Sequence, residues 1–241
     1  MRLDLALVER GLARSRSHAR QLIDSGRVAI PFQTAIKPST LVTSDTEIKV
    51  EVDPYVSRGA HKLMHALDDC GLRITGRVLD AGASTGGFTQ VLLERGATKV
   101  YAVDVGHGQM VEKLRKDLRV VVHEGLNLRD LTLDHLDNQP VDYVVADVSF
   151  ISLTMILEPI LRVMKPEGAA LVLVKPQFEV GRGGLDSQGV VINESARIRA
   201  LDSIIEYART LGWYLDWSAP SMLTGEKGNQ ETFCLFRSLP G

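Results

Sequence analysis

The sequence lacks several features that would point to particular classes of protein. Its 241 residues include only two cysteines, Cys70 and Cys234, in no metal-ligand spacing, which argues against a disulfide framework and a zinc site. No apolar run approaches the roughly 20 residues of a membrane helix, and the first residues lack the pattern of a signal peptide. The formal net charge of -2 excludes a basic field over the whole molecule, so attraction to nucleic acid must come from local clusters. We therefore expect a soluble, cytoplasmic protein that needs no metal and binds no membrane.

The remaining composition is that of an ordinary globular chain, with 44% hydrophobic and 24% charged residues. Its length allows one large domain and one small domain. Beyond residue 76, patterns typical of strands and helices alternate regularly, which predicts a parallel sheet with helices on both faces. Residues 153–164 are predicted to form an amphipathic helix interrupted only by Pro159. Residues 213–217 and 231–237 are predicted to pair as a hairpin.

The stretch VLDAGASTGGFT, residues 78–89, combines a short buried strand, a turn of small residues and the start of a helix. In such a turn a ligand can approach bare backbone. Compared with the dinucleotide fingerprint G-x-G-x-x-G, Ser84 stands where the second glycine should admit a pyrophosphate, and the Asp80 carboxylate would repel a diphosphate. A ligand with an amine and a sulfonium would instead be attracted by Asp80. We therefore expect S-adenosylmethionine as the cofactor.

Polar side chains also follow the next four strands, at the edge where open α/β sheets bind ligands. Asp104 ends the second strand, where ribose hydroxyls are usually held, and Asn127 follows the third as a weaker candidate for the adenine amino group. Asp147 and Lys175 end the fourth and fifth strands, so a carboxylate and an ammonium can meet beside the cofactor, either in catalysis or as a structural ion pair. The expected cofactor-binding residues are Asp80, Gly82, Ser84, Thr85, Gly86, Gly87, Phe88, Asp104, Val105, Asn127 and Asp147.

The first 52 residues predict a small domain of two short helices, over residues 2–10 and from Ser15 or Ser17 to residue 25, followed by short strands. Basic residues crowd this segment and can line one rim that faces phosphates, although a solvated helix face is an equal alternative on charge alone. The candidates for RNA contact are Arg14, Arg16, His18, Arg20, Arg27 and Arg58.

The motifs RLD, ERGLARSR, ARQLIDSGRV and EIKVEV occur in an order that resembles the S4 RNA-binding domain. This resemblance covers about the first 52 residues and favours RNA contact. The S4 pattern commonly has a Val-x-Val-Asn-Gly turn after the second helix. Here Pro31 and Phe32 stand in place of Asn-Gly, so we expect the local hairpin geometry to differ.

Four segments beyond residue 52 are predicted from local pattern alone. Residues 53–57, DPYVS, are predicted to be a linker because Pro54 favours an extended predecessor. Lys62 follows in a helix, at the edge of its apolar face, and spacing alone makes it a surface residue. Residues 180–192 are glycine-rich and are expected to form a loop that closes over the site. Composition would likewise place Glu226 and Glu231 in a surface loop.

The motifs SRGAHKL, DAGASTGGF, ADVSFISL, LVKPQFE and GNQE, behind an S4-like domain, resemble the TlyA family, often labelled hemolysin A. The catalytic half of this family is similar to FtsJ-type ribose 2'-O-methyltransferases, and the resemblance covers essentially the whole chain. It implies a Rossmann-like class I methyltransferase fold with a mostly parallel seven-stranded sheet over residues 58–241, plus a small α+β S4 domain over residues 1–52. It also implies S-adenosylmethionine as methyl donor and ribosomal RNA or ribosomal subunits as substrate. The implied catalytic tetrad is Lys62, Asp147, Lys175 and Glu231.

Three other functions have less support in the sequence. A membrane-active hemolysin lacks support because the sequence has no spanning segment and no long basic amphipathic helix. An RNA-binding assembly factor that binds the cofactor without turnover is disfavoured because all four tetrad positions are occupied. A base methyltransferase would favour an aromatic clamp such as Asn-Pro-Pro-Tyr after the fourth strand, where this sequence has Phe150 without the prolines.

Overall fold

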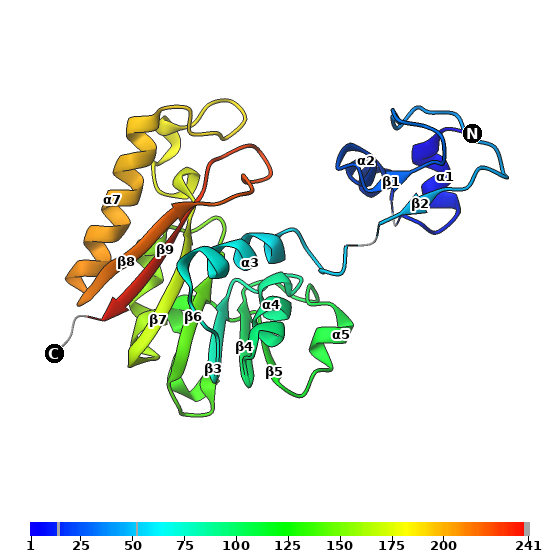
Figure 1. Cartoon of the computed structure of the whole chain (residues 1–241). Coiled ribbons are helices and arrows are strands. Elements are labelled where there is room, and N and C mark those ends of the chain that lie inside the picture. The colour runs from blue at the N-terminus through cyan, green and yellow to red at the C-terminus, as the bar shows by residue number, and fades with distance from the viewer. Residues whose placement is uncertain (14, 52, 239–241) are drawn as a thin grey trace. The chain divides into compact units, whose positions relative to one another are not determined.

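The computed structural model describes residues 1–13, 15–51 and 53–238 and divides the chain into two compact units, Met1–Pro54 and Tyr55–Gly241 (Figure 1). The predicted RNA contact Arg14 and the predicted end of the small domain at Val52 lie outside the described residues. The predicted linker 53–57 spans the boundary between the units. Its second half packs against the larger unit, where the Val56 N–H donates to Gln90 Oε1 at 3.0 Å. Among the described residues, no helix has both the length and the apolar character needed to cross a bilayer.

Two short helices and a pair of two-residue strands form the smaller unit. Its elements are helices α1 (Leu3–Glu9) and α2 (Arg16–Asp24) and the antiparallel strands β1 (Val28–Ala29) and β2 (Lys49–Val50). Of the two predicted caps, Ser15 begins α2, because its hydroxyl accepts from the His18 N–H at 3.2 Å. A single small core joins these elements through buried side chains that include Leu3, Leu7, Ala19, Leu22, Ile23 and Val28.

The chain reverses between Ile30 and Gln33 without an Asn-Gly pair. These two residues form an antiparallel bridge, and the Gln33 N–H donates to the Ile30 carbonyl at 3.1 Å. Phe32 takes a φ of 66°, the left-handed value that the second central position of a type II turn requires, with Pro31 at the first. The tight turn therefore forms, but with a positive φ on a fully exposed aromatic residue.

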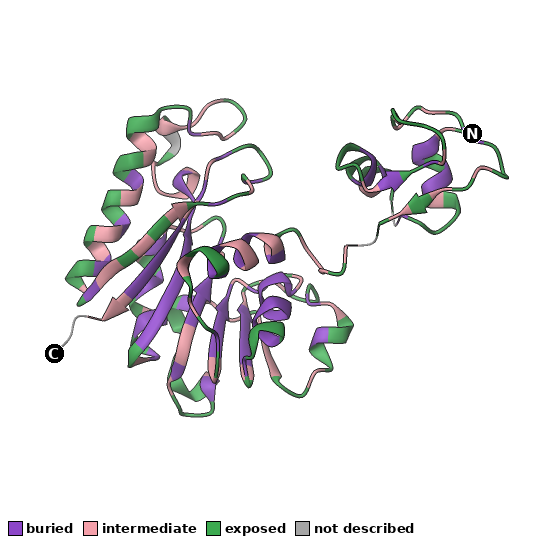
Figure 2. Ribbon diagram, viewed as in Figure 1, coloured by how far each residue is buried: buried purple, intermediate pink, exposed green. Residues whose placement is uncertain are grey.

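A seven-stranded sheet forms the centre of the larger unit, which confirms the predicted fold class (Figure 1). Its order is β5-β4-β3-β6-β7-β9-β8, and every pair is parallel except the two that β9 makes. The strands span β3 Arg77–Ala81, β4 Lys99–Asp104, β5 Val120–Glu124, β6 Val141–Ala146, β7 Met164–Val174, β8 Trp213–Pro220 and β9 Thr232–Ser238. The central strands are buried along most of their length, as Figure 2 shows, because helices cover both faces.

The helices divide between two hydrophobic clusters, one on each side of the sheet. Helices α3 (Gly59–Cys70), α4 (Gly87–Arg95) and α5 (Glu112–Arg115) contribute to one cluster, and α6 (Leu157–Arg162) and α7 (Glu194–Thr210) to the other. Along β3, Val78 belongs to the first cluster and Leu79 to the second, the alternation of a strand buried on both faces. Short 3-10 turns lie at η1 Leu128–Asp130, η2 Leu133–Leu136, η3 Leu153–Met155, η4 Pro176–Phe178 and η5 Arg182–Gly184.

The predicted helix over residues 153–164 is wrong in extent. The segment instead forms the turn η3 and the short helix α6, and Met164 already begins β7. Pro159 lies in the first turn of α6, where a missing N–H removes no intrahelical bond. In the middle of one continuous helix it would remove such a bond and its ring would clash with the preceding turn. Because α6 begins only at Leu157, Pro159 causes neither the lost hydrogen bond nor the clash.

The parallel strands bring their carboxyl ends to one edge of the sheet. Backbone hydrogen bonds fasten the residues just beyond the strands to their neighbours. The Gly82 N–H donates to the Val103 carbonyl at 2.8 Å, and the Asp147 N–H donates to the Ala81 carbonyl at 3.0 Å. The residues that directly follow β3 and β6 are therefore held at the ends of the neighbouring strands.

Candidate active site

In the turn between β3 and α4, the glycine backbone packs closely against neighbouring segments of the chain. Gly82 has a φ of 88°, and a Cβ there would lie 2.5 Å from the Asp147 carbonyl oxygen. A Cβ on Gly87, the first residue of α4, would lie 2.1 Å from Ser57 Oγ. Ser84 also takes a positive φ, of 47°, and its N–H donates to Asp104 Oδ2 at 2.8 Å. Larger side chains would push the walls apart, so the small residues leave a cradle of exposed backbone.

One cavity of about 530 Å³ opens beside this turn, at the ends of β3, β4 and β6. Asp104 lies on it with both carboxylate oxygens fixed, because Oδ1 accepts from the Gly106 N–H at 2.7 Å and Oδ2 from Ser84. Val105 beside it is 68% exposed and offers an apolar contact. The expected cofactor residues that line this cavity are Gly82, Ser84, Asp104, Val105, Asn127 and Asp147.

Asn127 lines the same cavity but already uses its side-chain oxygen. Oδ1 caps the η1 turn by accepting from the Arg129 N–H at 3.1 Å, and it also accepts from Arg129 Nε at 3.2 Å. An adenine amino group is a donor and would need this same oxygen. Asn127 therefore lines the cavity with its side-chain oxygen already bonded within the protein.

Asp80 lies behind the turn and lines neither of the two cavities described in this section. Its side chain is fully buried, and Oδ2 accepts from the Thr89 hydroxyl in α4 at 2.6 Å. The other oxygen has no hydrogen-bond partner among the described residues. Burial raises the pKa of Asp80 to about 7. This position differs from the expected direct contact with a cationic ligand, because the carboxyl group instead ties the strand to the first turn of α4.

The four residues of the implied tetrad meet at a second cavity, of about 520 Å³, on the other side of the turn. Lys62 comes from α3, Asp147 follows β6, Lys175 follows β7 and Glu231 precedes β9. All four line this cavity, together with Thr85, Gly87 and Phe88 of the turn. Asp147 and Ser84 line both cavities, so the two spaces adjoin at the turn.

The tetrad forms two ion pairs of different character. Lys62 Nζ lies 2.5 Å from Glu231 Oε2, and these side chains are only 8% and 2% exposed. Lys175 Nζ lies 2.6 Å from Asp147 Oδ1 and also donates to Ser149 Oγ at 2.9 Å. Two ammonium groups and two carboxylates therefore line one cavity, and each charge has an opposite partner.

The loop before β9 is built around the Glu231 carboxylate. Gly225 lies against it, and a Cβ there would be 2.7 Å from Glu231 Oε1. Asn229 is 3% exposed, and its side chain accepts from the Val191 N–H at 2.9 Å and donates to the Gly189 carbonyl at 3.0 Å. The predicted glycine-rich loop is thus fastened to the loop that carries Glu231, and Gly189 lines the cavity.

Two neighbours of the tetrad, Ser149 and Phe150, are absent from the predicted site residues. Ser149 binds Lys175, and nothing in its spacing distinguishes it from an ordinary loop serine. Phe150 is 92% exposed, has a φ of 66° and lines both cavities, and its ring centroid lies 5.3 Å from that of Phe178. A positive φ on an exposed aromatic residue at the mouth of a site is a strained arrangement that suits a ligand contact.

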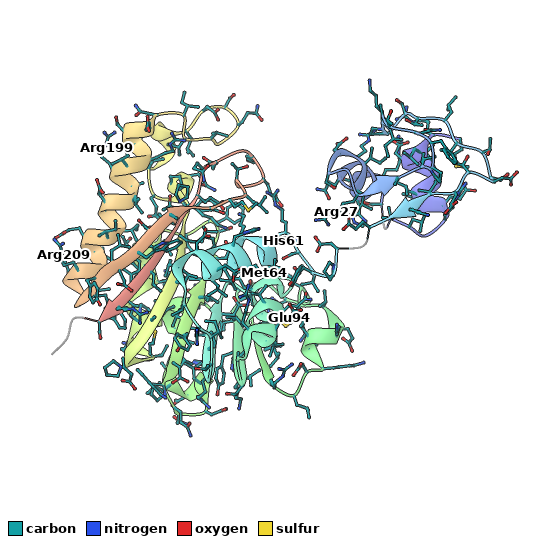
Figure 3. The ribbon with its side chains drawn as sticks, in the orientation of Figure 1. Arg27, His61, Met64, Glu94, Arg199 and Arg209 are labelled. Carbon is teal, nitrogen blue, oxygen red and sulfur yellow. The ribbon has the colours of Figure 1, made fainter. Side chains whose placement is uncertain are left out.

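The candidate RNA contacts are mostly engaged with carboxylates. Arg16 and Arg20 both lie near Asp4, and Arg27 (Figure 3) pairs with Asp53 at 2.6 Å. His18 is half-buried in the first turn of α2. Arg58 lines the second cavity of the larger unit, where its guanidinium donates to the Thr224 carbonyl at 2.7 Å. The predicted residues of the smaller unit therefore do not form one uniform cluster.

Two family models match the chain, an S4 domain over residues 1–48 and an FtsJ-like methyltransferase over residues 55–238. Among curated proteins, the 16S/23S rRNA (cytidine-2'-O)-methyltransferase TlyA of Mycobacterium tuberculosis is 46% identical, over 98% of this chain and 90% of its own. Hemolysin A of Brachyspira hyodysenteriae is 37% identical, over 98% of this chain and 99% of its own.

Solved structures agree with these matches. A protein of Streptococcus thermophilus that carries the name hemolysin is 34% identical, with a TM-score of 0.79, over 100% of this chain and 89% of its own. A fibrillarin/Nop5p complex matches 80% of this chain and 85% of its own at 14% identity and a TM-score of 0.54, which shows a shared fold alone. The chain therefore belongs to the TlyA family, in which an S4 domain precedes an FtsJ-like methyltransferase domain.

Proposed function

We propose that this chain transfers a methyl group from S-adenosylmethionine to a ribose 2'-hydroxyl of ribosomal RNA, and that it acts in the cytoplasm. The observation that carries this proposal is that Lys62, Asp147, Lys175 and Glu231, from four distant parts of the sequence, line one cavity beside the glycine turn. The M. tuberculosis relative is named for this reaction at cytidine in 16S and 23S rRNA. We take residues 1–52 as the RNA-docking domain and residues 58–241 as the catalytic domain.

The residues at the first cavity fit S-adenosylmethionine. Gly82 has no Cβ and lines this cavity, so a ligand can lie against its backbone. Asp104 is a carboxylate held rigidly by two N–H donors, and it can still accept from the two hydroxyls of a ribose. When bound, S-adenosylmethionine supplies an electrophilic methyl group. The shared wall at Ser84 and Asp147 would allow that methyl to face the tetrad cavity.

The residues of the second cavity fit the needs of a ribose hydroxyl. A 2'-hydroxyl is a weak nucleophile at neutral pH, so its oxygen must gain negative charge as it attacks. We assign Lys175 to hold this oxygen, because Asp147 and Ser149 fix its ammonium in the wall of the cavity. An ammonium so placed stabilises the developing alkoxide, and the hydroxyl proton leaves to water as the oxygen takes the methyl group. The buried Lys62–Glu231 pair supplies a second ammonium to the same cavity.

Substitution of Lys175 tests the proposal against a matched control. Lys175→Ala should abolish methyl transfer to ribosomal RNA while the Kd for S-adenosylmethionine stays within about threefold of wild type, since the cofactor contacts lie elsewhere. Lys165 starts the same strand at its other end and pairs with Asp142 at 2.6 Å, so Lys165→Ala removes a comparable ion pair far from the site. That control should keep full activity. Loss of cofactor binding together with activity in Lys175→Ala would mean that Lys175 is structural.

A further inference from the structure

Asp4 is a fully buried carboxylate surrounded by three arginines. It lies in the first turn of α1, where its side chain is 0% exposed. Arg2 binds it through two nitrogens, with Nε 3.0 Å from Oδ1 and Nη2 3.2 Å from Oδ2. Arg16 Nη2 lies 3.0 Å and Arg20 Nε 3.6 Å from Oδ2. Hydrogen bonding to Arg2 holds the pKa of the Asp4 carboxyl well below its usual range, so it is ionised at neutral pH.

The three guanidinium groups remain accessible although they share this partner. Their side chains are 41%, 52% and 54% exposed for Arg2, Arg16 and Arg20. Arg16 and Arg20 stand one helical turn apart on α2 and would repel each other without a carboxylate between them. One negative charge against three positive charges leaves a net charge of about +2 at this point of the surface. The cluster is therefore a fixed local positive charge on a chain whose total charge is -2.

Three arginines held by one carboxylate are better placed to bind phosphate than three arginines without a common partner. Each guanidinium has five N–H donors in a rigid plane, and Asp4 engages one or two atoms of each, which leaves further donors on the solvent side. Long side chains lose rotamer freedom when they bind a ligand, and a buried carboxylate that already holds them reduces this loss. A phosphate chain would thus meet donors that are already in place.

We propose that Asp4 is a positioning residue that holds Arg2, Arg16 and Arg20 as one preformed surface for RNA phosphates. This inference rests on the proposed function in taking ribosomal RNA as the partner. It adds Arg2, which sequence reasoning did not single out, to the RNA contacts. It leaves Arg27 outside the cluster, because that guanidinium pairs with Asp53 instead.

The proposal and simple electrostatics make opposite predictions for Asp4→Asn. Removing a negative charge raises the positive charge of the unit, and if charge alone decided the affinity, RNA would bind more tightly. If Asp4 positions the arginines, the same change releases them and RNA binds more weakly. Asp24→Asn is the matched control, because Asp24 is an exposed acid on α2 and its replacement changes the net charge equally.

The experiment measures binding of the full-length chain to a 23S ribosomal RNA transcript from about 50 to 200 mM salt. Asp4→Asn should weaken binding about tenfold and reduce the slope of log K against log salt by one to two contacts, roughly 0.7 to 1.8. Asp24→Asn should bind as well as wild type or more tightly. Binding by Asp4→Asn that equals or exceeds binding by Asp24→Asn would overturn the proposal.

A second variant keeps the proposal testable if Asp4→Asn fails to fold. Arg2→Gln leaves Asp4 paired with two arginines and should reduce the salt slope by about one contact. An unchanged slope and affinity for Arg2→Gln would also overturn the proposal. These readouts measure binding alone, so they are separate from the proposed reaction: absence of methyl transfer by the wild type refutes the function, whatever the variants bind.

Discussion

Neutralising one member of the Lys62–Glu231 pair should destabilise the larger unit, and neutralising both should restore much of the loss. The two side chains are 8% and 2% exposed, and their charged atoms lie 2.5 Å apart. Glu231→Gln leaves a buried ammonium without its carboxylate, and Lys62→Met leaves a buried carboxylate without its ammonium. Loss of one partner of a buried ion pair typically costs about 3–5 kcal/mol. For a unit of this size, each kcal/mol lowers Tm by about 2–4 °C, so each single variant should melt about 6–20 °C lower.

The double variant Lys62→Met/Glu231→Gln separates a structural from a catalytic contribution. Replacing both charges with neutral groups of similar size is often nearly neutral for stability, so its Tm should exceed that of either single variant. Methyl transfer should nevertheless be lost in all three proteins. Thermal unfolding with a parallel assay of RNA methylation measures both quantities.

A surface pair gives the reference for these values. Arg209 (Figure 3) and Glu206 lie 3.4 Å apart on α7 and are 69% and 67% exposed, so Glu206→Gln should change the unfolding free energy by less than about 1 kcal/mol. If the loss of unfolding free energy in the Lys62/Glu231 double variant equals the sum of the losses in the two single variants, the two charges are not coupled. An active double variant would refute their part in the reaction.

Three further predictions follow from single side chains around the site. Burial raises the pKa of Asp80 to about 7 from 3.8. Between pH 3.8 and about 7, the folded chain therefore holds a proton on Asp80 that the unfolded chain has released. Stability should therefore fall as pH rises through this window, by up to about 1.4 kcal/mol per pH unit, and Asp80→Asn should remove that dependence in urea unfolding curves. Asp104→Ala should raise the Kd for S-adenosylmethionine about 10- to 100-fold in calorimetry, through lost charge-assisted hydrogen bonds, and an unchanged Kd would place the ribose elsewhere. Phe150→Ala should raise KM for RNA about 5- to 150-fold, the value of one base stacked on an aromatic ring, with cofactor affinity unchanged. A fall in cofactor affinity alone would assign this ring to the other cavity.

The fold was predictable because its signals are local. Strands buried on both faces read as apolar runs, and small residues between a strand and a helix mark the ligand turn whatever lies around them. Asp104, Asp147 and Lys175 could be placed at one edge because parallel strands must end there. The position of Pro159 limited one helix in a way that its apolar spacing did not reveal.

The details that decide the chemistry depend on contacts far apart in the sequence. Lys62 and Glu231 are separated by 169 residues, so neither local pattern shows that the other removes it from water. The Asp80 carboxyl group is buried behind the turn, where it accepts a hydrogen bond from the Thr89 hydroxyl, although its position at a strand end suggested a ligand contact. Lys62 and Glu231 were predicted to belong to the site only through the resemblance to a known family.

The proposed reaction is defined by the atom that receives the methyl group, a ribose 2'-oxygen of ribosomal RNA. The most direct measurement is mass mapping of 2'-O-methylated nucleotides in ribosomal RNA from cells with the gene, without it, and with the gene carrying Lys175→Ala. We predict at least one ribose methylation that is present with the wild-type gene and absent in the other two. Identical 2'-O-methylation in all three RNAs, or a methyl group that depends on the gene but lies on a base, would contradict the account.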